Sequence, residues 1–504
     1  MNLGLVIAAV VAGIFGGVRW LRVAQREHYL APATILFAAR WWSLGLRNRG
    51  LGLVAVLAAA ASFVVAPVGF VTALVLVVGP FGLTVKGRTG KLAWTRRLRT
   101  VAAFVLVLVA AAVGVGAALG FAGPVAILAV LAFPLLVDLA LVILGPVERA
   151  LARTFVTSAT TTLDRIDPIR VAITGSYGKT TIKGYVRHLV TGSRSVVASP
   201  ASFNNTAGLS RAINEHLALD TEVFVAEMGT YGPGEIASMV QWVRPSISVL
   251  AAIGPVHLER FGDLDTIVKA KSEIFATSRT AILNIDAHGL AREADRLATS
   301  GIRVIRCSAE SPEADVYVTR DDDGLTVTRA GEAVAAGVEV DAAPTNVACA
   351  VAVASVLGVT DDDIAARLPG LPGAEHRRQV SVSPSGVTVI DDTYNSNPAG
   401  AAAAVATLRS TAAERRVVVT PGMVELGKRQ RPENERFGEA AARAADDLLI
   451  VGRTNREALT FGARDENATL HFMETRDAAV AWVRSELTEG DAVLYENDLP
   501  DHYP

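Results

Sequence analysis

A glycine-rich turn, GSYGKTT, has the residue types that bind the phosphates of a nucleotide. It follows an apolar, β-forming run at 171–174 and precedes a helical pattern, which is the context that a phosphate loop requires. The glycines let backbone N–H groups approach phosphate oxygens, the lysine adds a positive charge, and the threonine after it offers a hydroxyl to Mg²⁺. We therefore expect ATP and Mg²⁺ here, although the two glycines are closer together than in the full Walker motif. The residues expected to bind the nucleotide are Gly175, Ser176, Gly178, Lys179, Thr180 and Thr181.

Two further polar groups follow buried apolar runs. The runs at 223–226 and 247–253 end in polar residues, which puts Glu227 and His257 at the carboxyl ends of two predicted parallel strands. Open α/β sheets carry their sites at this edge. Glu227 and Thr180 suit one Mg²⁺, and His257 suits a second. Each group also has a structural explanation, which is an ion pair for Glu227 and a satisfied polar contact for His257.

The order of the polar motifs resembles the Mur ligase family, and within it the UDP-N-acetylmuramoyl-tripeptide:D-alanyl-D-alanine ligase branch. The resemblance covers residues 169–494, and the motifs that carry it are GSYGKTT, FNN, AEMG, GPVHLERFG, KAKSEIF, DDTYNSNP and VELG. It implies a P-loop α/β central domain at 169–375 and a Rossmann-like α/β C-terminal domain at 376–504. It also implies an enzyme that activates a carboxylate with ATP as an acyl phosphate, which an amine then attacks to form an amide.

The chemistry that the resemblance implies explains the charged residues. Phosphoryl transfer to a carboxylate brings two anions together, so metal ions and lysine charge must offset their repulsion. Lys271 matches the family lysine that becomes carbamoylated, and thus anionic, beside a second Mg²⁺; its alternative is a solvated charge on a helix. The expected catalytic residues are Lys179, His257 and Lys271. The expected ligands of two Mg²⁺ ions are Thr180, Glu227, His257 and Lys271.

Other residues match family positions beside the nucleotide or the substrate. A mobile C-terminal domain would close over ATP and exclude water from the hydrolysable acyl phosphate. The family's HNxxN pattern is degraded, because Thr345 and Cys349 replace its histidine and its second asparagine. The matched nucleotide-binding residues are Asn284, Asn346, Arg377 and Asp392. The matched substrate residues are Asn204, Asn205, Tyr394, Asn395 and Asn397, with turn formation as the alternative for the first two.

The N-terminal part of the chain has the composition of a membrane protein. Of the 504 residues 51% are hydrophobic and only 19% are charged, and the mean hydropathy is +0.36. Soluble proteins have about 25% charged residues. We expect about five transmembrane helices in residues 1–146, followed by a linker or interfacial helix at 147–168. The apolar segments lie near 2–21, 51–66, 68–85, 101–121 and 125–144.

The charges between the apolar segments predict the orientation of the chain. Arginines and lysines gather at 22–49 and 86–99, whereas the turns near Pro67 and at 120–124 have none. The sequence therefore predicts a multi-pass plasma-membrane protein with its N-terminus outside and its catalytic domains in the cytoplasm. A cleaved signal peptide is the alternative for the first segment, and a hairpin about Pro67 is the alternative for the second and third. Asp138 in the fifth segment marks either a site or a contact at a helix end.

The composition of the chain and its departures from the family exclude several classes of binding partner. A net charge of −2 disfavours nucleic acid, and the widely separated Cys307 and Cys349 suggest neither a disulfide framework nor a zinc site. The membrane segments replace the UDP-binding domain, so a soluble UDP-linked substrate is disfavoured. The expected partners are the lipid bilayer, a carboxylate substrate of soluble or lipid-linked kind, and an amino acid or other amine. The acidic, aromatic end at 494–504 replaces a KGS-type stretch and either binds a cationic amine or packs.

The predicted function is a membrane-anchored, ATP-dependent carboxylate-amine ligase in cell-envelope or peptidoglycan-related synthesis. A poly-γ-glutamate-synthase-like ligase, which extends a peptide at a membrane, is the alternative among enzymes. A transporter driven by a cytoplasmic ATPase is an alternative of another class, but its helices would need polar pathway residues that are almost absent here. A nonenzymatic binding module is disfavoured because Lys179, Glu227, His257 and Lys271 occur together.

Overall fold

The computed structural model describes residues 3–84, 92–200, 203–373, 379–393, 396–499 and 502–503. The chain divides into two compact units, which we call the helical unit and the sheet unit. The helical unit comprises Met1–Ala150 together with Gly452–Thr454 and Asp498–Pro504. The sheet unit comprises Leu151–Val451 and Asn455–Asn497. Two short segments from the second half of the sequence therefore belong to the helical unit.

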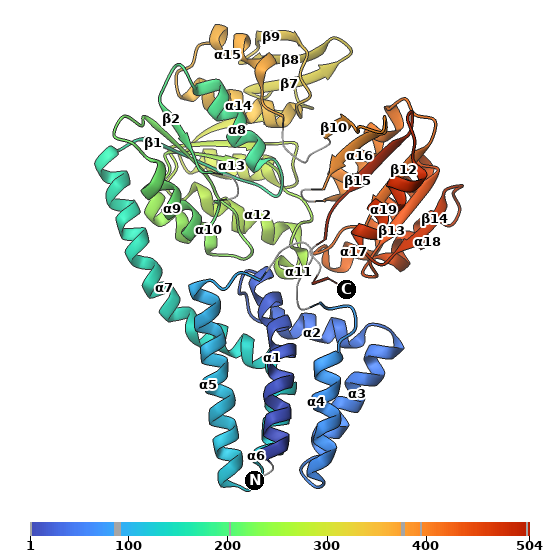
Figure 1. Cartoon of the computed structure of the whole chain (residues 1–504). Helices are drawn as coiled ribbons and strands as arrows, with labels where there is room; N and C mark the ends of the chain where they lie inside the picture. Colours follow the sequence, from blue (N-terminus) through green and yellow to red (C-terminus); the bar gives the residue numbers. More distant parts are fainter. Residues whose placement is uncertain are drawn as a thin grey trace. The chain divides into compact units, whose positions relative to one another are not determined.

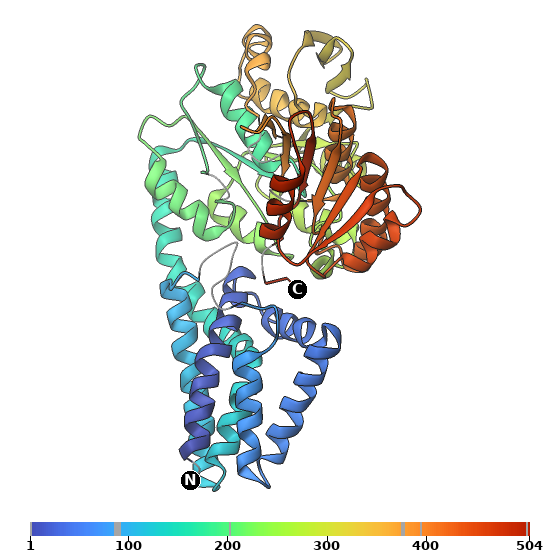
Figure 2. The same ribbon diagram turned by 45° about the vertical axis from the view of Figure 1, so that its right-hand side comes forward.

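The helical unit is built from the apolar N-terminal segments, whose Leu and Ala residues are good helix formers. Its helices are α1 (Leu3–Arg26), α2 (Ala33–Ser43), α3 (Gly45–Ala61), the 3₁₀ turn η1 (Ala66–Val68), α4 (Gly69–Val78), α5 (Arg96–Ala118), α6 (Ala122–Leu131) and the first part of α7 (Phe133–Ile166). Both views show α1, α4 and α5 running lengthwise through this unit (Figure 1, Figure 2). α1 packs against α4 and α6, so it lies at the centre of the helical packing.

Two of these helices, α1 and α5, are each long and apolar enough to cross a membrane. The pair α2 and α3 and the pair α6 and α7 also qualify when each is taken as one span, although their members meet at 114° and 74°. Among the described residues there are thus two candidate spans, or four with the bent pairs, and the apolar segment Ala66–Val78 is shorter. The prediction of about five transmembrane helices, like insertion into a membrane, stays a prediction.

The last apolar segment differs from the single helix expected at 125–144. The helix breaks at Ala132, and α7 starts with Pro134 in its first turn, where the missing N–H of proline leaves no helical hydrogen bond unmade. α7 then continues through Pro146 to Ile166, so the segment expected as a linker or interfacial helix is the second half of one long helix. Helix-forming residues on both sides of Pro146 keep the chain helical there despite the lost hydrogen bond.

Asp138 in the fifth apolar segment has a structural role. Its carboxylate accepts hydrogen bonds from the N–H groups of Thr34 (3.2 Å) and Ile35 (2.8 Å) at the start of α2. A carboxylate at this place satisfies free donors of a helix N-terminus and complements the helix dipole. Arg19 does the converse at the end of α4, where its guanidinium donates to the carbonyl of Gly79 (2.6 Å). The contact at a helix end therefore accounts for Asp138.

The first part of the sheet unit contains a nine-stranded sheet with the order β2-β3-β1-β4-β5-β6-β7-β8-β9. Neighbouring strands from β2 to β7 in this order pair parallel. β8 pairs antiparallel with both β7 and β9. The central strands β1, β3 and β4 are mostly apolar and buried, as expected for strands that are covered on both faces. The strands are β1 (Ile169–Thr174), β2 (Val196–Ala198), β3 (Val223–Glu227), β4 (Ile247–Leu250), β5 (Thr280–Asn284), β6 (Arg303–Ser308), β7 (Val316–Asp321), β8 (Gly324–Arg329) and β9 (Glu332–Val338).

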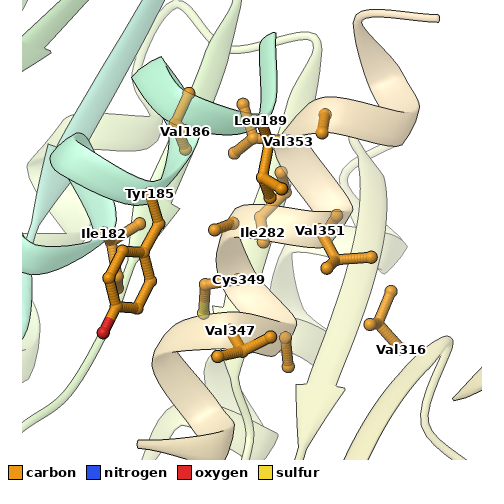
Figure 3. Close-up of a cluster of buried hydrophobic side chains, with 14 of the residues drawn as sticks. Ile182, Tyr185, Val186, Leu189, Ile282, Val316, Val347, Cys349, Val351 and Val353 are labelled. Atoms are coloured by element: carbon orange, nitrogen blue, oxygen red, sulfur yellow. The ribbon is translucent and has the colours of Figure 1, made fainter. Parts of the chain in front are cut away.

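Helices cover both faces of this sheet. On one face α8 (Lys179–Val190) and α14 (Pro344–Val356) enclose a core in which Ile182, Tyr185 and Cys349 lie close together (Figure 3). On the other face α9 (Thr206–His216), α10 (Glu235–Val243), α12 (Leu264–Ser272) and α13 (Leu290–Thr299) bury a second core. The short helices α11 (Leu258–Phe261) and α15 (Asp361–Arg367) complete this part. Cys307 and Cys349 are both buried as free thiols.

A second sheet has six strands in the order β10-β11-β15-β12-β13-β14. Among the described residues of this sheet β10 and β11 pair antiparallel, and the other strands pair parallel with helices between them. The strands are β10 (Gln379–Val382), β11 (Thr388–Asp392), β12 (Arg416–Thr420), β13 (Asp447–Val451), β14 (Thr469–Met473) and β15 (Ala492–Glu496). The helices are α16 (Pro398–Ser410), α17 (Gln430–Ala444), α18 (Arg456–Ala463) and α19 (Arg476–Glu486). The prediction of a central and a C-terminal α/β domain after the helical segment is confirmed.

Candidate functional site

The glycine-rich turn lies between the carboxyl end of β1 and the start of α8. Gly178 has a φ of 79°, which a glycine adopts without strain. The N–H of Ser176 donates to the carbonyl of Ala252 (2.7 Å), and this bond ties the turn to the loop after β4. Because β1 lies between β3 and β4, the loops of three neighbouring strands meet beside the N-terminus of α8. A helix N-terminus in such a loop is a ready site for phosphate.

Replacing Gly178 by alanine is expected to weaken nucleotide binding and to destabilise the chain by about 1–2 kcal/mol. The alanine would keep a positive φ, and its Cβ would lie 2.5 Å from Oδ1 of Asn346. Gly232→Ala is the matched control, because a Cβ at Gly232 would meet nothing within 4 Å. The rise in Tm on adding ADP measures the effect, and an equal rise in both variants would contradict the assignment of this turn to phosphate.

Two lysines converge on the glycine-rich turn. Nζ of Lys179 donates to the carbonyl of Gly175 (2.7 Å), and Nζ of Lys271 donates to the same carbonyl (3.1 Å). Lys271 is only 2% exposed, so the alternative of a solvated helix charge is wrong. Burial, followed by the positive charge of Lys179, lowers the pKa of Lys271 well below its ordinary value. Burial beside Lys179 therefore disfavours the ammonium form of Lys271 relative to an exposed lysine.

The carboxylate of Glu227 is the polar centre of the site. It is buried at the end of β3 and accepts hydrogen bonds from the hydroxyl of Thr180 (2.9 Å), from Nζ of Lys183 (2.9 Å) and from the amide of Asn204 (3.2 Å). Burial alone would raise the pKa of Glu227, but the charges of Lys183 and Lys179 and the hydrogen bonds bring it below its ordinary value. Glu227 is thus held as an anion beside the turn.

Lys183 is a member of this cluster that the motifs do not predict. It is 5% exposed and forms a buried ion pair with Glu227, which is the structural alternative considered for that carboxylate. The spacing from Lys179 could have indicated Lys183 as a site residue. Lys183 follows Lys179 by one turn of α8, and residues four apart on a helix lie on one face. Thr181 lies on the same first turn, but no contact links it to Glu227 in the described part of the chain.

These side chains fit one Mg²⁺ ion. A hydroxyl and a carboxylate, from Thr180 and Glu227, present hard oxygen ligands 2.9 Å apart beside the phosphate turn. Mg²⁺ completes its six ligands with phosphate oxygens and water, so it needs few ligands from the protein. The described residues contain no group of three or more His, Cys, Asp or Glu side chains that would hold a metal by themselves.

His257 lies apart from Glu227, at the start of α11, and it has a φ of 54°. Its Nδ1 contacts the carboxylate of Glu425, which follows β12 in the second sheet. Its ring packs edge-on against Tyr231, with ring centroids 4.9 Å apart. The imidazole therefore joins the loops of the two sheets. Glu425 was not expected as a site residue, although the VELG motif that contains it was part of the family resemblance.

The predicted asparagines fall into two groups. The amide of Asn204 donates to Glu227, and the side chain of Asn346 on α14 lies next to Gly178. Both asparagines therefore lie at the glycine-rich turn. Asn205 accepts a hydrogen bond from the N–H of Gly208 (2.9 Å) at the start of α9, which is the turn-forming alternative. Asn284, at the end of β5, is buried, and its side chain accepts a hydrogen bond from a backbone N–H two residues later (3.2 Å).

The predicted residues of the second sheet lie partly outside the described chain. Arg377, Tyr394 and Asn395 are outside the described residues. Asp392 ends β11, opposite the last residue of β15. The side chain of Asn397 accepts a hydrogen bond from a backbone N–H (2.9 Å) at the start of α16, and so serves as its N-cap.

Glu496 is a buried carboxyl group that the motifs do not predict. It ends β15 and accepts hydrogen bonds from the hydroxyls of Ser396 and Thr420, the latter at 2.5 Å. Burial, together with the charge of Asp392, raises the pKa of Glu496 to about 7 although these hydroxyl bonds lower it. Glu496 is fully buried, and its side chain joins the end of β15 to the end of β12 and to the segment that precedes α16.

Comparison with known families supports the family resemblance that the motifs indicate. Residues 173–354 match the family described as Mur ligase middle domain, and residues 376–495 match Mur ligase, glutamate ligase domain. The chain is similar to the UDP-N-acetylmuramoyl-tripeptide--D-alanyl-D-alanine ligase of Mycobacterium tuberculosis, with 33% identity over 357 residues, which is 64% of this chain and 69% of the relative. The ligase of the same description from Escherichia coli is 28% identical over 302 residues, covering 58% and 66% of the two chains.

Solved structures have the same fold as the sheet unit. MurF ligase from Thermotoga maritima in complex with ADP has a TM-score of 0.59 and 24% identity, covering 69% of this chain and 80% of its own. MurF from Acinetobacter baumannii has a TM-score of 0.57 and 24% identity, covering 69% and 77%. The likeness to these solved structures shows the fold of the sheet unit, whereas the sequence relatives above show the family.

Proposed function

The chain belongs to the Mur ligase family, and from this premise we propose that it joins a carboxylate to an amine through an acyl phosphate while anchored in a membrane. It is an ATP-dependent ligase that forms amide bonds, and its relatives indicate a role in peptidoglycan synthesis. A transporter ATPase and a nonenzymatic binding module are set aside with this assignment. The acyl phosphate, the membrane anchor and the nature of the carboxylate are the parts that we propose.

The proposed reaction has two steps. In the first, a carboxylate oxygen attacks the γ-phosphorus of ATP, the bond to the β-phosphate oxygen breaks, and ADP leaves. In the second, the amine attacks the carbonyl carbon of the acyl phosphate and the bond between that carbon and the bridging oxygen breaks. Inorganic phosphate leaves with the oxygen and the bonding electron pair, and the nitrogen loses a proton to water. Both steps need positive charge near the transferred group. Lys179 and the N–H groups at the start of α8 supply it at the turn.

The observation that carries this proposal is the convergence of polar groups on Glu227 beside the phosphate turn. A hydroxyl, an ammonium and an amide from α8 and the start of α9 all meet one buried carboxylate. Burying a carboxylate without partners is costly, so these contacts hold its position and its charge. We propose that this arrangement orients Thr180 and Glu227 toward a metal-bound nucleotide.

Mg²⁺ would neutralise the charge of the phosphates when bound. We propose Thr180 and Glu227 as ligands of one ion, and His257 with a carbamate on Lys271 as ligands of a second. A free amine is the form of lysine that adds CO₂, and burial next to Lys179 favours that form at Lys271. An ammonium group at this place would repel the ion instead.

The remaining predicted residues keep their proposed roles. We propose Asn284, Asn346, Arg377 and Asp392 for the nucleotide, and Asn204, Asn205, Tyr394, Asn395 and Asn397 for the substrate. The proposed domains are the membrane region 1–146, the connecting helical segment 147–168, the central domain 169–375 and the C-terminal domain 376–504. Closure of the last domain would exclude water from the acyl phosphate.

The helical unit supports the proposed membrane anchor and the choice of carboxylate. α1 and α5 have the length and composition of membrane spans. The family matches begin only at residue 173, so the helices occupy the chain before the central domain. We propose that the carboxylate is a cell-envelope precursor at the membrane surface, lipid-linked rather than soluble. A ligase that extends poly-γ-glutamate is the alternative, and the mass of the product separates the two.

The proposed orientation predicts which cysteines an impermeant maleimide reaches in intact cells. Leu119→Cys, in the turn after α5, is expected to be labelled from outside, and Ala93→Cys, before α5, only after the membrane is opened. Both positions are exposed, while the native cysteines are buried and serve as the unlabelled background. Lys86, Arg88 and Lys91, on which the orientation partly rests, lie outside the described residues. The reverse labelling would contradict cytoplasmic catalytic domains.

ADP release by the detergent-solubilised chain tests the proposed function. We expect release only when a carboxylate and an amine are both present. The probes are UDP-N-acetylmuramoyl-tripeptide, its lipid-linked form, and D-alanyl-D-alanine, with product mass as the readout. Faster release with the lipid-linked form supports the membrane substrate. Release that is independent of both organic substrates would contradict the ligase assignment.

A further inference from the structure

Two donors share one oxygen atom of the buried carboxylate of Glu227. Its Oε2 accepts hydrogen bonds from the hydroxyl of Thr180 and from Nζ of Lys183, both at 2.9 Å. The amide of Asn204 donates to the other oxygen, Oε1, at 3.2 Å. Thr180 and Glu227 are the groups that we propose for Mg²⁺. The ammonium group of Lys183 therefore contacts the same carboxylate oxygen that Thr180 faces.

The ion pair between Lys183 and Glu227 is shielded from solvent. The two side chains are 7% and 2% exposed. Water and salt screen such a pair only weakly, and a buried carboxylate that loses its partner keeps an uncompensated charge. Lys183 therefore supplies the positive charge that the buried carboxylate of Glu227 requires.

Hydrogen bonds of the main chain fix the position of Glu227. Its N–H donates to the hydroxyl of Ser199 (3.1 Å), and the N–H of Met228 donates to the carbonyl of Ile173 on β1 (2.8 Å). Lys183 lies on α8, which packs against the core on one face of the sheet. The two charged groups therefore start from fixed backbone positions, and the flexible stem of Lys183 is the part of the pair that can move.

An ammonium group and a divalent cation compete for one carboxylate oxygen. Both are attracted by the negative charge, and they repel each other at the short distance that a shared oxygen imposes. Mg²⁺ is also strongly hydrated, and it exchanges its water for protein oxygens reluctantly. A free Mg²⁺ ion therefore gains less from Glu227 while the ammonium group of Lys183 is bonded to Oε2.

We propose that Lys183 is a positioning residue that serves as an internal counter-ion of Glu227 and competes with free Mg²⁺ for this carboxylate. The inference rests on the proposed function, in which Glu227 is a metal ligand. Lys183 holds the carboxylate beside Thr180 when no metal is bound. Its competition weakens the binding of the free metal, and the phosphate oxygens of a nucleotide offset this loss because they supply further ligands.

Mn²⁺ binding tests the competition in the full chain in detergent, without nucleotide. Mn²⁺ takes oxygen ligands as Mg²⁺ does, and its free form is measured by electron paramagnetic resonance. Lys183→Gln removes the positive charge but keeps an N–H donor, so we expect it to bind Mn²⁺ about tenfold more tightly than the native chain. A purely structural role of Lys183 would lower the Tm of this variant without tightening the binding of Mn²⁺.

Two variants serve as controls for Lys183→Gln. Arg187→Gln removes a positive charge from an exposed position one turn later on α8, and is expected to change the Mn²⁺ affinity by less than about twofold. Lys183→Arg keeps the positive charge and is expected to bind Mn²⁺ as weakly as the native chain. Tighter binding by Lys183→Arg would overturn the proposal even if Lys183→Gln does not fold.

Glu227→Gln shows whether the tighter binding occurs at this carboxylate. In the double variant Lys183→Gln with Glu227→Gln, the gain in Mn²⁺ affinity is expected to disappear. A gain that persists in the double variant, or equal affinity of the native chain and Lys183→Gln, would overturn the proposal. The ligase reaction is tested separately by ADP release from the native chain, which stays dependent on both substrates if this inference alone fails.

Discussion

Replacing Lys179 by alanine is expected to lower ADP formation by about 10²–10³-fold with little change in stability. The ammonium group of Lys179 donates to the carbonyl of Gly175 in the glycine-rich turn, and we propose that it adds positive charge there beside the transferred phosphoryl group. The side chain is not part of the apolar core, so its loss removes charge stabilisation rather than packing. ADP formation at saturating ATP, measured beside the Tm of the variant, separates the two effects.

Arg187→Ala is the matched control for Lys179→Ala. Both residues lie on α8, but Arg187 is exposed in its last turn, away from the glycine-rich turn. The control is expected to keep ADP formation within about twofold, since exposed substitutions away from a site have small effects. Turnover of Lys179→Ala equal to that of the control would contradict the assignment of the turn to ATP.

Replacing Lys271 by alanine is expected to lower activity by a similar factor, about 10²–10³-fold, because a carbamate on this lysine would act as an anionic metal ligand. Addition of a short-chain carboxylic acid is expected to restore part of the activity, since the acid can occupy the vacated space and supply the missing carboxylate. Removal of CO₂ is expected to lower the activity of the native chain. Rates of ADP formation in the presence of both substrates measure all three effects.

Lys269→Ala is the matched control for Lys271→Ala. Lys269 lies two residues earlier on α12 and is exposed, whereas Lys271 is buried beside the glycine-rich turn. The control is expected to keep full activity with no response to added acid. Full activity of Lys271→Ala in CO₂-depleted buffer would refute the carbamate. Loss of activity without any rescue, in a variant of unchanged Tm, would refute it as well.

The parts of the site that the sequence predicts well are local. The phosphate turn needs a strand, glycines and a helix in direct succession, and all are adjacent in the sequence and present in the structure. Glu227 follows the same logic, since an apolar run that ends in a carboxylate marks the carboxyl end of a strand. The two α/β sheets, each covered by helices, follow from the alternation of such runs with helical segments.

The parts that the sequence does not predict depend on distant contacts. The pairing of His257 with Glu425 joins loops that are 168 residues apart, and the bond from Trp41 to His502 spans 461 residues. No local periodicity specifies such pairs. The break at Ala132 is not predicted for another reason: an apolar run gives no indication of a bend, and Pro134 is tolerated in the first turn of the new helix.

Transfer of ¹⁸O from the carboxylate substrate to inorganic phosphate tests the proposed chemistry most directly. The carboxylate of the tripeptide precursor is enriched in ¹⁸O and incubated with the chain, ATP, Mg²⁺ and D-alanyl-D-alanine, and the released phosphate is analysed by mass spectrometry. An acyl phosphate passes one carboxylate oxygen to phosphate when the amine displaces it, so we predict one ¹⁸O atom in each phosphate formed with an amide. Amide formation with unlabelled phosphate would contradict the acyl phosphate.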